Sequence, residues 1–249
     1  MIIEMLGAPG AGKTTALEHV IDAIAAHGRE VRTVETAARP LMERTLLGRL
    51  VGRLGRFRDP ALWRLFVLRR LAFGYLELVR HPRLTILLAR SQLGRPSGAD
   101  VRARRVWRWF VRALGTNSLL RRLGTPGEVY VVDEGLCHRT VQLFSSSVET
   151  PDDRWIPEYV RSIPAPDLVV YVRAGVEACQ ARVETRGTWG HWQHRTSDQI
   201  DTYVANAHTA ATLTAEHSAA SGIRLLVFEN GDSGADWAAL ASQVGDQLG

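Results

Sequence analysis

Hydrophobic and polar residues follow one pattern at the two ends of the chain and another in its middle. The short apolar run Ile2–Leu6 predicts a strand, and apolar residues at helical spacing over 16–24 predict the helix that follows it. Strand and helix patterns alternate again after residue 127. Residues 38–125 show helical spacing without a convincing strand. We therefore expect an α/β fold with a large, all-helical insertion at about 38–125.

The expected elements can be placed from these periodicities and from the glycine and proline residues that bound them. Strands are expected at 2–6, 31–35, 128–132, 168–173 and 224–228. Helices are expected at 16–24, 41–56, 60–79, 84–93, 99–114, 136–146, 153–162, 176–186, 198–220 and 235–248.

A glycine-rich segment separates the first strand from the first helix. Residues 7–14, GAPGAGKT, match the pattern G-x-x-x-x-G-K-S/T in the strand–loop–helix setting that this P-loop motif requires. Such a loop binds phosphate oxygens with its backbone N–H groups and the helix N-terminus. We expect Lys13 to reach the β- and γ-phosphates and Thr14 to bind Mg²⁺. The residues predicted to bind the nucleotide here are Pro9, Gly10, Ala11, Gly12, Lys13, Thr14 and Thr15.

Two carboxylates end the strand expected at 128–132. In open α/β sheets, ligands bind at the carboxyl ends of the strands, so Asp133 and Glu134 are candidates for the same site. Asp133 is predicted to hold Mg²⁺, directly or through water. Glu134 is predicted either to accept a proton from a substrate hydroxyl or to assist the metal. Lys13, Asp133 and Glu134 are thus the first catalytic candidates.

Nearly all basic residues are arginines, and most of them lie in the middle of the chain. Among 31 lysines and arginines, Lys13 is the only lysine. The net charge of +5 conceals a segment, 36–125, with 20 arginines against four carboxylates, while the remainder carries a net charge of −11. Three interpretations stay open for the arginines: pairing with the acidic remainder, lining a pocket for an anionic substrate, or contacting nucleic acid or an anionic membrane. The residues that suggest such a contact are Arg104, Arg105, Trp107, Arg108, Trp109 and Arg112.

The cysteines and the N-terminal sequence indicate where in the cell the protein is expected. Cys137 and Cys179 lack the spacing of a metal site, which is typical of a reduced compartment. The sequence begins with a strand pattern and has no signal-peptide pattern. No apolar run approaches the roughly 18 residues that span a bilayer. A cytoplasmic location is therefore expected.

Four blocks of sequence together resemble the P-loop kinases of the nucleoside and nucleotide monophosphate type, with thymidylate kinase as the nearest general comparison. The resemblance covers roughly the first 35 and the last 120 residues. The blocks are the P-loop, Asp133-Glu134-Gly135, the segment 166–172 followed by 181–187, and the strand 224–228 with its loop 229–232.

The resemblance implies an architecture. Such kinases are P-loop NTPases with a three-layer α/β/α fold, in which helices cover both faces of a five-stranded parallel sheet. On this basis 1–249 would form a single kinase-like domain with a mobile lid at about 175–198. A homodimer is common in the family.

The resemblance also implies roles for residues near the C-terminus. Arg182 and Arg186 share one face of the lid helix and would contact ATP phosphates or stack near the base. Arg195 would supply positive charge to the transition state, as an arginine finger does. Asn230 and Gly231 would line the adenine, mostly through their backbone.

Two segments depart from the thymidylate kinase pattern, and both belong to the acceptor site of that family. An Asp-Arg pair is replaced by Asp133-Glu134, with Arg139 as the next arginine, and an Arg-Glu-Pro-Gly segment is replaced by 35–40. Glu35, Arg39 and Arg139 are therefore acceptor-binding candidates. A surface ion pair is the alternative for each of the two arginines.

These features together predict an ATP- and Mg²⁺-dependent phosphotransferase that acts on a small molecule. A nucleoside or nucleotide is the default acceptor, and a sugar or specialised-metabolite hydroxyl is the second choice. A different class also stays open, namely an NTP-binding switch or regulatory ATPase whose basic helices dock on nucleic acid or a membrane.

Overall fold

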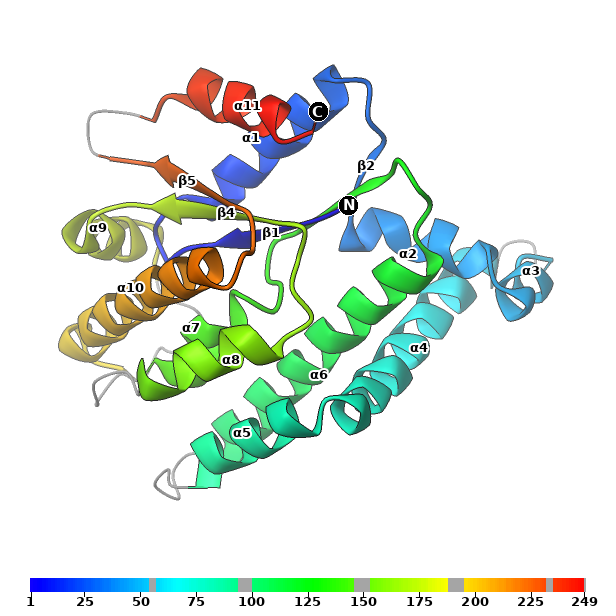
Figure 1. Cartoon of the computed structure of the whole chain (residues 1–249), viewed down its shortest axis with the longest axis horizontal. Helices are drawn as coiled ribbons and strands as arrows, with labels where there is room; N and C mark the ends of the chain where they lie inside the picture. Colours follow the sequence, from blue (N-terminus) through cyan, green and yellow to red (C-terminus); the bar gives the residue numbers. More distant parts are fainter. Residues whose placement is uncertain (54–56, 94–99, 146–152, 188–194, 232–234, 249) are drawn as a thin grey trace. The chain divides into compact units, whose positions relative to one another are not determined.

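Five parallel strands form the sheet in the computed structural model of this chain, in the order β2-β3-β1-β4-β5. The structure describes residues 1–53, 57–93, 100–145, 153–187, 195–231 and 235–248. The parallel sheet and the helices around its strands confirm the predicted α/β fold class (Figure 1).

The chain divides into two compact units. We call residues 3–28 and 133–249 the P-loop unit, and residues 1–2 and 29–132 the helical unit. Each unit is described by itself below.

The P-loop unit contains three of the strands. Strand β1 pairs with β4 from Ile3↔Leu168 to Leu6↔Tyr171, and β4 pairs with β5 from Val169↔Leu225 to Arg173↔Glu229. The elements of this unit are β1 (Ile2–Leu6), α1 (Lys13–Ala26), α7 (Arg139–Phe144), η3 (Asp153–Trp155), α8 (Ile156–Ser162), β4 (Leu168–Arg173), α9 (Val176–Arg186), α10 (Ser197–Ala220), β5 (Leu225–Glu229) and α11 (Trp237–Asp246).

Helices cover both faces of these strands, as the predicted three-layer fold requires. Figure 1 shows α1 and α11 on one face of β1, β4 and β5, with α7, α8 and α10 on the other. Trp237 of α11 packs against Phe228 of β5, with 5.1 Å between ring centroids. All residues of β1 are buried, which explains its nearly continuous apolar sequence.

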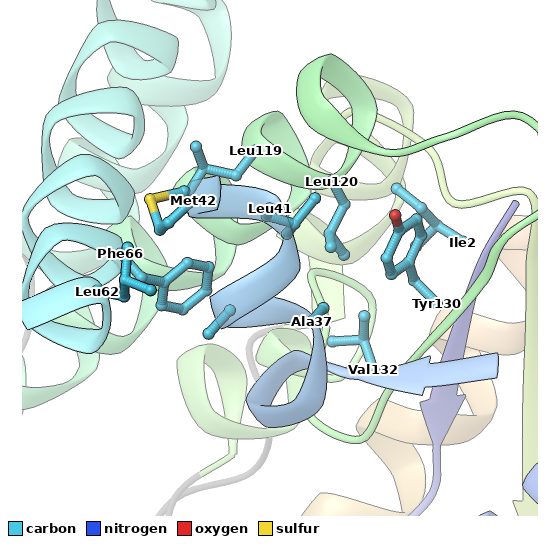
Figure 2. Close-up of a cluster of buried hydrophobic side chains, with 11 residues drawn as sticks. Ile2, Ala37, Leu41, Met42, Leu62, Phe66, Leu119, Leu120, Tyr130 and Val132 are labelled. Carbon is cyan, nitrogen blue, oxygen red and sulfur yellow. The ribbon is translucent and has the colours of Figure 1, made fainter. Parts of the chain in front are cut away.

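The helical unit contains β2 and β3, which pair in parallel from Val31↔Val129 to Thr33↔Val131. Its helices cover one side of β3. Figure 2 shows Leu41 and Met42 of α2, Leu62 and Phe66 of α4, and Leu119 and Leu120 of α6 in one buried cluster with Tyr130 and Val132. The elements are β2 (Val31–Thr33), α2 (Val34–Glu43), α3 (Leu46–Val51), α4 (Arg58–Arg80), α5 (Pro82–Leu93), α6 (Asp100–Leu123) and β3 (Val129–Val132).

Two glycines bring α4 and α6 into close contact. A Cβ atom on Gly74 would lie 2.1 Å from the carbonyl oxygen of Val111, and one on Gly115 would lie 1.7 Å from that of Arg70. The two helix backbones therefore approach each other where neither side chain intervenes. This contact fixes which side of α4 is buried.

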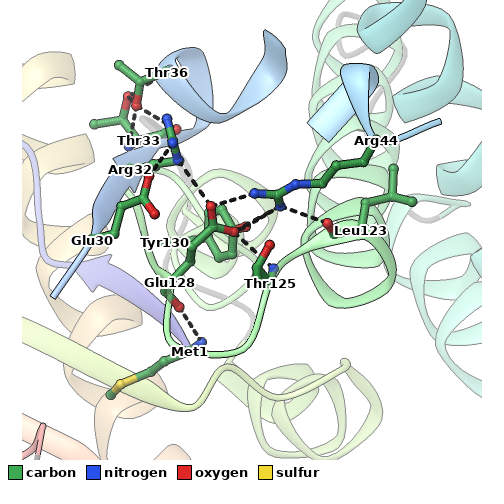
Figure 3. Close-up of polar contacts among 10 residues, drawn as sticks. All are labelled: Met1, Glu30, Arg32, Thr33, Thr36, Arg44, Leu123, Thr125, Glu128 and Tyr130. Atoms are coloured by element: carbon green, nitrogen blue, oxygen red, sulfur yellow. Dashed lines mark hydrogen bonds and ion pairs between the residues drawn. The ribbon is translucent and has the colours of Figure 1, made fainter. Parts of the chain in front are cut away.

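A buried carboxylate joins β3 to the helices around it. Glu128, 4% exposed, accepts hydrogen bonds from Arg44 Nη1 (2.9 Å) and Nη2 (2.6 Å) and from the backbone N–H of Thr125 (2.9 Å). The hydroxyl of Tyr130 also donates to it, and Arg32 Nε lies 3.4 Å away (Figure 3). Hydrogen bonding from Arg44 is the main cause that holds the pKa of Glu128 well below its usual value.

The second strand is shorter than predicted because a helix begins within the expected span of 31–35. The Oγ1 atoms of Thr33 and Thr36 each accept a hydrogen bond from the other residue's backbone N–H, which forms a capping box. The strand ends at Thr33, so Glu35 lies in the first turn of α2 and is exposed. A threonine occupies the capping position that usually carries Glu or Gln, which hid this helix start.

Two helix predictions in the basic segment were also wrong in extent. The helix expected at 41–56 is replaced by α2 and α3, because the side chain of Thr45 accepts from the backbone N–H of Gly48 (3.0 Å) and starts a new helix. Helix α6 continues to Leu123 rather than ending at residue 114. Gly115 sits inside it as a helix contact, not at its end.

Candidate active site

The glycine loop between β1 and α1 takes a conformation that only glycine tolerates at two positions. Gly10 and Gly12 have φ values of 82° and 92°, in the left-handed region. A Cβ atom on Gly10 would lie 2.3 Å from the carbonyl oxygen of Cys179, and one on Gly12 would lie 2.1 Å from Asn230 Nδ2. The loop therefore packs tightly against α9 and the segment after β5, and its shape depends on both glycines.

Lys13 is the first residue of α1, and its ammonium group closes the glycine loop. Its Nζ atom donates to the carbonyl oxygens of Gly7 and Ala8, both at 3.0 Å. An ammonium has three donors, so these two bonds leave one for a ligand. Gly12 precedes the helix and has no side chain to cap the first-turn N–H groups. Such N–H groups form an anion site.

The electrostatic surroundings of Lys13 include both predicted carboxylates. Enclosure lowers the pKa of Lys13 from its usual value, while the charges of Asp133 and Glu134 act in the opposite direction. Arg186 adds to the lowering. Asp133 and Glu134 are exposed beyond the end of β3. The charges of both carboxylates and of Arg186 thus act on the loop lysine within the P-loop unit.

Arg182 and Asn230 hold the glycine loop from outside. Arg182 Nη1 donates to the carbonyl oxygen of Gly10, and its Nη2 to that of Asn230, both at 3.3 Å. The buried side chain of Asn230 donates from Nδ2 to the carbonyl oxygen of Ala11 at 2.7 Å. We expected Asn230 to act through its backbone toward adenine, but its amide side chain supports the loop. The carbonyl oxygen of Gly231 lies 3.5 Å from Arg182 Nη2.

A buried glutamate in β1 fixes the segment that follows the two carboxylates. The carboxylate of Glu4, 1% exposed, accepts from the backbone N–H groups of Leu136 (2.9 Å) and Cys137 (2.8 Å). A Cβ atom on Gly135 would lie 2.1 Å from the carboxyl carbon of Glu4. Burial raises the pKa of Glu4, and the two backbone bonds oppose that rise. Glu4 therefore positions the backbone directly after Asp133 and Glu134.

Arg139 is buried, and its guanidinium group already forms hydrogen bonds within the protein. Its Nη1 atom donates to Glu134 Oε2 at 3.0 Å and its Nη2 to the carbonyl oxygen of Glu134 at 3.1 Å. Its side chain is 9% exposed, whereas that of Glu134 is 51% exposed. Arg139 therefore orients Glu134, and its predicted role in gripping an acceptor stays a prediction. The ion pair left open by the sequence is present, and it joins a buried guanidinium to a half-exposed carboxylate.

The remaining predicted residues are less closely connected. Thr14 and Thr15 are exposed in the first turn of α1, and Arg195 is exposed just before α10. Within the helical unit, Arg39 pairs with Glu43 (3.0 Å) and Asp59 (3.4 Å) on an exposed surface. Residues 188–194 of the predicted lid lie outside the described residues. The acceptor roles of Glu35 and Arg39 stay predictions.

Sequence analysis missed two buried residues of the P-loop unit. Glu4 carried one signal, a lone carboxylate in an apolar run, which we did not use. His138 carried none. It is 5% exposed, burial lowers its pKa well below the usual value, and the positive charges of Lys13 and Arg139 add to that effect. Within the part of the chain that the structure describes, its Nδ1 atom has no hydrogen-bond partner.

Comparisons with known proteins give similar structures but no sequence family. No protein-family model matches the chain, and no curated protein matches it. The similar solved structures include deoxyadenosine kinase from M. mycoides with the products dCMP and a flexible dCDP bound, at 14% identity and a TM-score of 0.41 over 100% of this chain and 98% of that one. The same enzyme with dCTP (12%, 0.39, 100% and 98%) and with dATP (13%, 0.40, 100% and 99%) is also similar. We base the function on the residues of this chain.

Proposed function

We propose that this protein is an ATP- and Mg²⁺-dependent phosphotransferase that acts on a small-molecule acceptor. The observation that carries the proposal is the arrangement around Lys13. The ammonium group closes a loop shaped by left-handed glycines, and the charges of Asp133 and Glu134 act on it. A cation, open helix N–H groups and nearby carboxylates are the parts that phosphoryl transfer requires.

The residues present fit a nucleotide with its metal. The first-turn N–H groups of α1 and the third donor of Lys13 would bind the β- and γ-phosphates. The Thr14 hydroxyl and the Asp133 carboxylate are the oxygen donors that Mg²⁺ prefers, with phosphate and water completing its shell. When bound, Mg²⁺ would neutralise charge on the transferred phosphoryl group. Arg182 would keep the loop in shape, while Arg186 and Arg195 would add positive charge.

The acceptor would meet Asp133 and Glu134. Because Arg139 holds Glu134 through both the carboxylate and the carbonyl oxygen, Glu134 is oriented before any ligand arrives. Either carboxylate would orient an acceptor hydroxyl or phosphate and accept its proton. A nucleoside or nucleotide is the default acceptor, and a sugar or specialised-metabolite hydroxyl is the alternative.

The single lysine makes the nucleotide site directly testable. An amine-selective acetylating reagent can modify only one side chain, Lys13, besides the N-terminal amine of Met1. We expect saturating MgATP to protect Lys13 from acetylation, as read by peptide mass spectrometry, while the N-terminal amine serves as the internal reference. Equal acetylation of Lys13 with and without MgATP would remove the basis of the proposal.

Acceptor identity is tested by transfer of labelled phosphate. ATP carrying ³²P at the γ-phosphate is incubated with the protein and a panel of nucleosides, nucleotides, sugars and metabolite alcohols. A kinase should transfer label to one class, and its ATP turnover should rise with that class alone. If no small molecule is labelled while hydrolysis responds to vesicles or nucleic acid, the regulatory ATPase alternative replaces the kinase.

A further inference from the structure

Exposed hydrophobic side chains are concentrated in one part of the helical unit. Of the eleven large hydrophobic residues that are exposed in the described part of the chain, ten lie between Leu46 and Ile86, and the other is Val227. Single exposed hydrophobic residues are ordinary on protein surfaces. A concentration of this kind marks an interaction surface.

Helix α3 is packed with its glycine inward and its leucines outward. A Cβ atom on Gly48 would lie 1.8 Å from the carbonyl oxygen of Met42, so this residue faces the protein at close range. Leu46, Leu47 and Leu50 are 75%, 48% and 59% exposed. A helix that only had to stabilise the fold would bury the leucines, because each buried leucine is stabilising. The observed orientation leaves them for a partner.

Helix α4 also exposes hydrophobic residues, over a longer span. Its buried side consists of Leu62, Phe66, Gly74, Glu77 and Leu78, and Gly74 contacts the backbone of α6. Leu68, Leu76 and Val79 lie on its outward side at helical spacing, with exposures of 66%, 39% and 78%. Because Gly74 must face α6, this side of α4 must face away from α6. We call Leu46, Leu47, Leu50, Leu68, Leu76 and Val79 the docking face.

The charge around the docking face selects the kind of partner. Residues 46–86 contain nine arginines and two carboxylates, a net charge of +7. Arg49, Arg53 and Arg64 are exposed among the hydrophobic residues. A partner that covers this surface must offer both an apolar interior and negative charge. An anionic lipid bilayer has these two properties together.

Other occupants fit less well. A second copy of the chain would bring two surfaces of the same positive sign together, which opposes association. Nucleic acid is bound through phosphate contacts and through aromatic stacking. Of the ten exposed hydrophobic residues described between Leu46 and Ile86, only Phe57, Trp63 and Tyr75 are aromatic, so nucleic acid would leave most of this apolar surface uncovered. No described helix has both the length and the apolar character to cross a bilayer. A helical surface of this kind lies on the membrane and does not span it.

We propose that the helical unit docks on anionic membranes through this face, with the leucines and Val79 entering the interface and the arginines contacting lipid headgroups. The proposal is independent of phosphoryl transfer. It also differs from our sequence-based expectation, which placed a membrane contact around Arg104 and Trp107.

The test is co-flotation of the full chain with vesicles. We expect binding to phosphatidylcholine vesicles that contain phosphatidylglycerol, little binding to phosphatidylcholine alone, and weakening as NaCl rises from about 0.05 M to about 0.5 M. Leu46→Ser with Leu50→Ser should lower binding about tenfold by removing apolar surface. Arg49→Ser with Arg53→Ser should lower it about tenfold by removing charge.

Two variants in the P-loop unit serve as matched controls. Val227→Ser removes the exposed hydrophobic residue outside the docking face, and Arg161→Ser removes an exposed arginine on α8. Both should bind vesicles as the unmodified chain does. Thermal unfolding checks that every variant remains folded, and the salt dependence of the unmodified chain gives a readout that needs no variant.

Three results would overturn the proposal. The first is no binding to anionic vesicles, and the second is equal binding by the docking-face variants and their controls. The third is occupancy by another partner. If the chain does not bind vesicles but self-associates, and Leu68→Ser with Val79→Ser abolishes this self-association, the partner is a second copy. If the chain does not bind vesicles but binds an oligonucleotide through Arg49 and Arg53, the partner is nucleic acid.

Discussion

The two units use buried polar side chains for different purposes. In the P-loop unit, Glu4 and Asn230 bind backbone groups and thereby fix the segment after β3 and the glycine loop. In the helical unit, Glu128 and Glu77 bind side chains from other elements, chiefly those of arginines. A site made of backbone N–H groups needs its backbone held in place. A set of helices needs only to be held together.

The two units also differ in net charge. The helical unit has 22 arginines and seven carboxylates, a net charge of +15, and the P-loop unit has nine basic and 19 acidic residues, a net charge of −10. Glu128 and Glu77 engage only a few of the 22 arginines. Others, including Arg49, Arg53 and Arg64, are exposed in the span that also contains most of the exposed hydrophobic residues. The difference suggests that the P-loop unit carries the chemistry and the helical unit carries the contact with a partner.

The largest effect is expected from substitution of Lys13, which lies in the P-loop unit. We expect Lys13→Ala to lower phosphoryl transfer by ~10³-fold, because a preorganised donor to the developing charge is lost. Lys13→Arg should be nearly as inactive, since the planar fork does not fit where the ammonium contacts Gly7 and Ala8. Labelled-phosphate transfer measures both variants, and thermal unfolding should show that both are folded. Substantial activity in Lys13→Arg would contradict this account of the lone lysine.

The helical unit should be most sensitive at Arg44. Arg44→Ala leaves the carboxylate of Glu128 buried without its main partner, so we expect a loss of about 3 kcal/mol in the free energy of unfolding. Urea unfolding measures this loss. Arg83→Ala removes an exposed arginine of α5 and should change the free energy by less than about 0.5 kcal/mol. Similar values for the two variants would show that the Glu128 network is not stabilising.

Glu4 tests whether a buried residue of the P-loop unit supports chemistry. In Glu4→Gln, one of the two acceptors facing the N–H groups of Leu136 and Cys137 becomes a donor, which displaces the segment after Glu134. We expect kcat to fall by about 10²-fold, as misplacement of a catalytic group does, with a smaller change in the KM for MgATP. Glu18→Gln, on the exposed side of α1, is the control. A kcat equal to that of the unmodified chain would reduce Glu4 to a purely structural residue.

The smallest expected effect is a pH dependence. The pKa of Glu128 in the folded protein lies below its unfolded value of about 4.3. Its contribution to stability is therefore present above about pH 4 and is lost as pH falls toward the folded value. Urea unfolding at several acidic pH values should show a shallower loss of stability in Glu128→Gln than in the unmodified chain. Parallel curves would mean that other carboxylates carry the acid sensitivity.

Much of the P-loop unit could be predicted from sequence because its signals are local. The run 168–173 and the helix 176–186 were placed correctly from apolar spacing and the residues at their ends. Prediction was weaker where a residue's role depends on a distant contact. Gly115 looked like the end of a helix, and only its contact with Arg70 explains why the helix continues. Arg139 looked available for a ligand, and only the folded chain shows that it holds Glu134.

The sequence by itself determined the α/β fold class, the glycine loop with its single lysine, and the basic character of residues 36–125. Each of these depends on local spacing or on composition, which the chain carries before it folds. Tertiary structure alone decided that Glu4 supports the segment after β3 and that Asn230 supports the loop. It also decided that α3 exposes its three leucines and that α4 exposes Leu68 and Leu76. These outcomes depend on contacts between segments that are far apart in the sequence. At Gly48 and Gly74, the lack of a Cβ atom allows a close backbone contact, and this contact sets which side of each helix is buried.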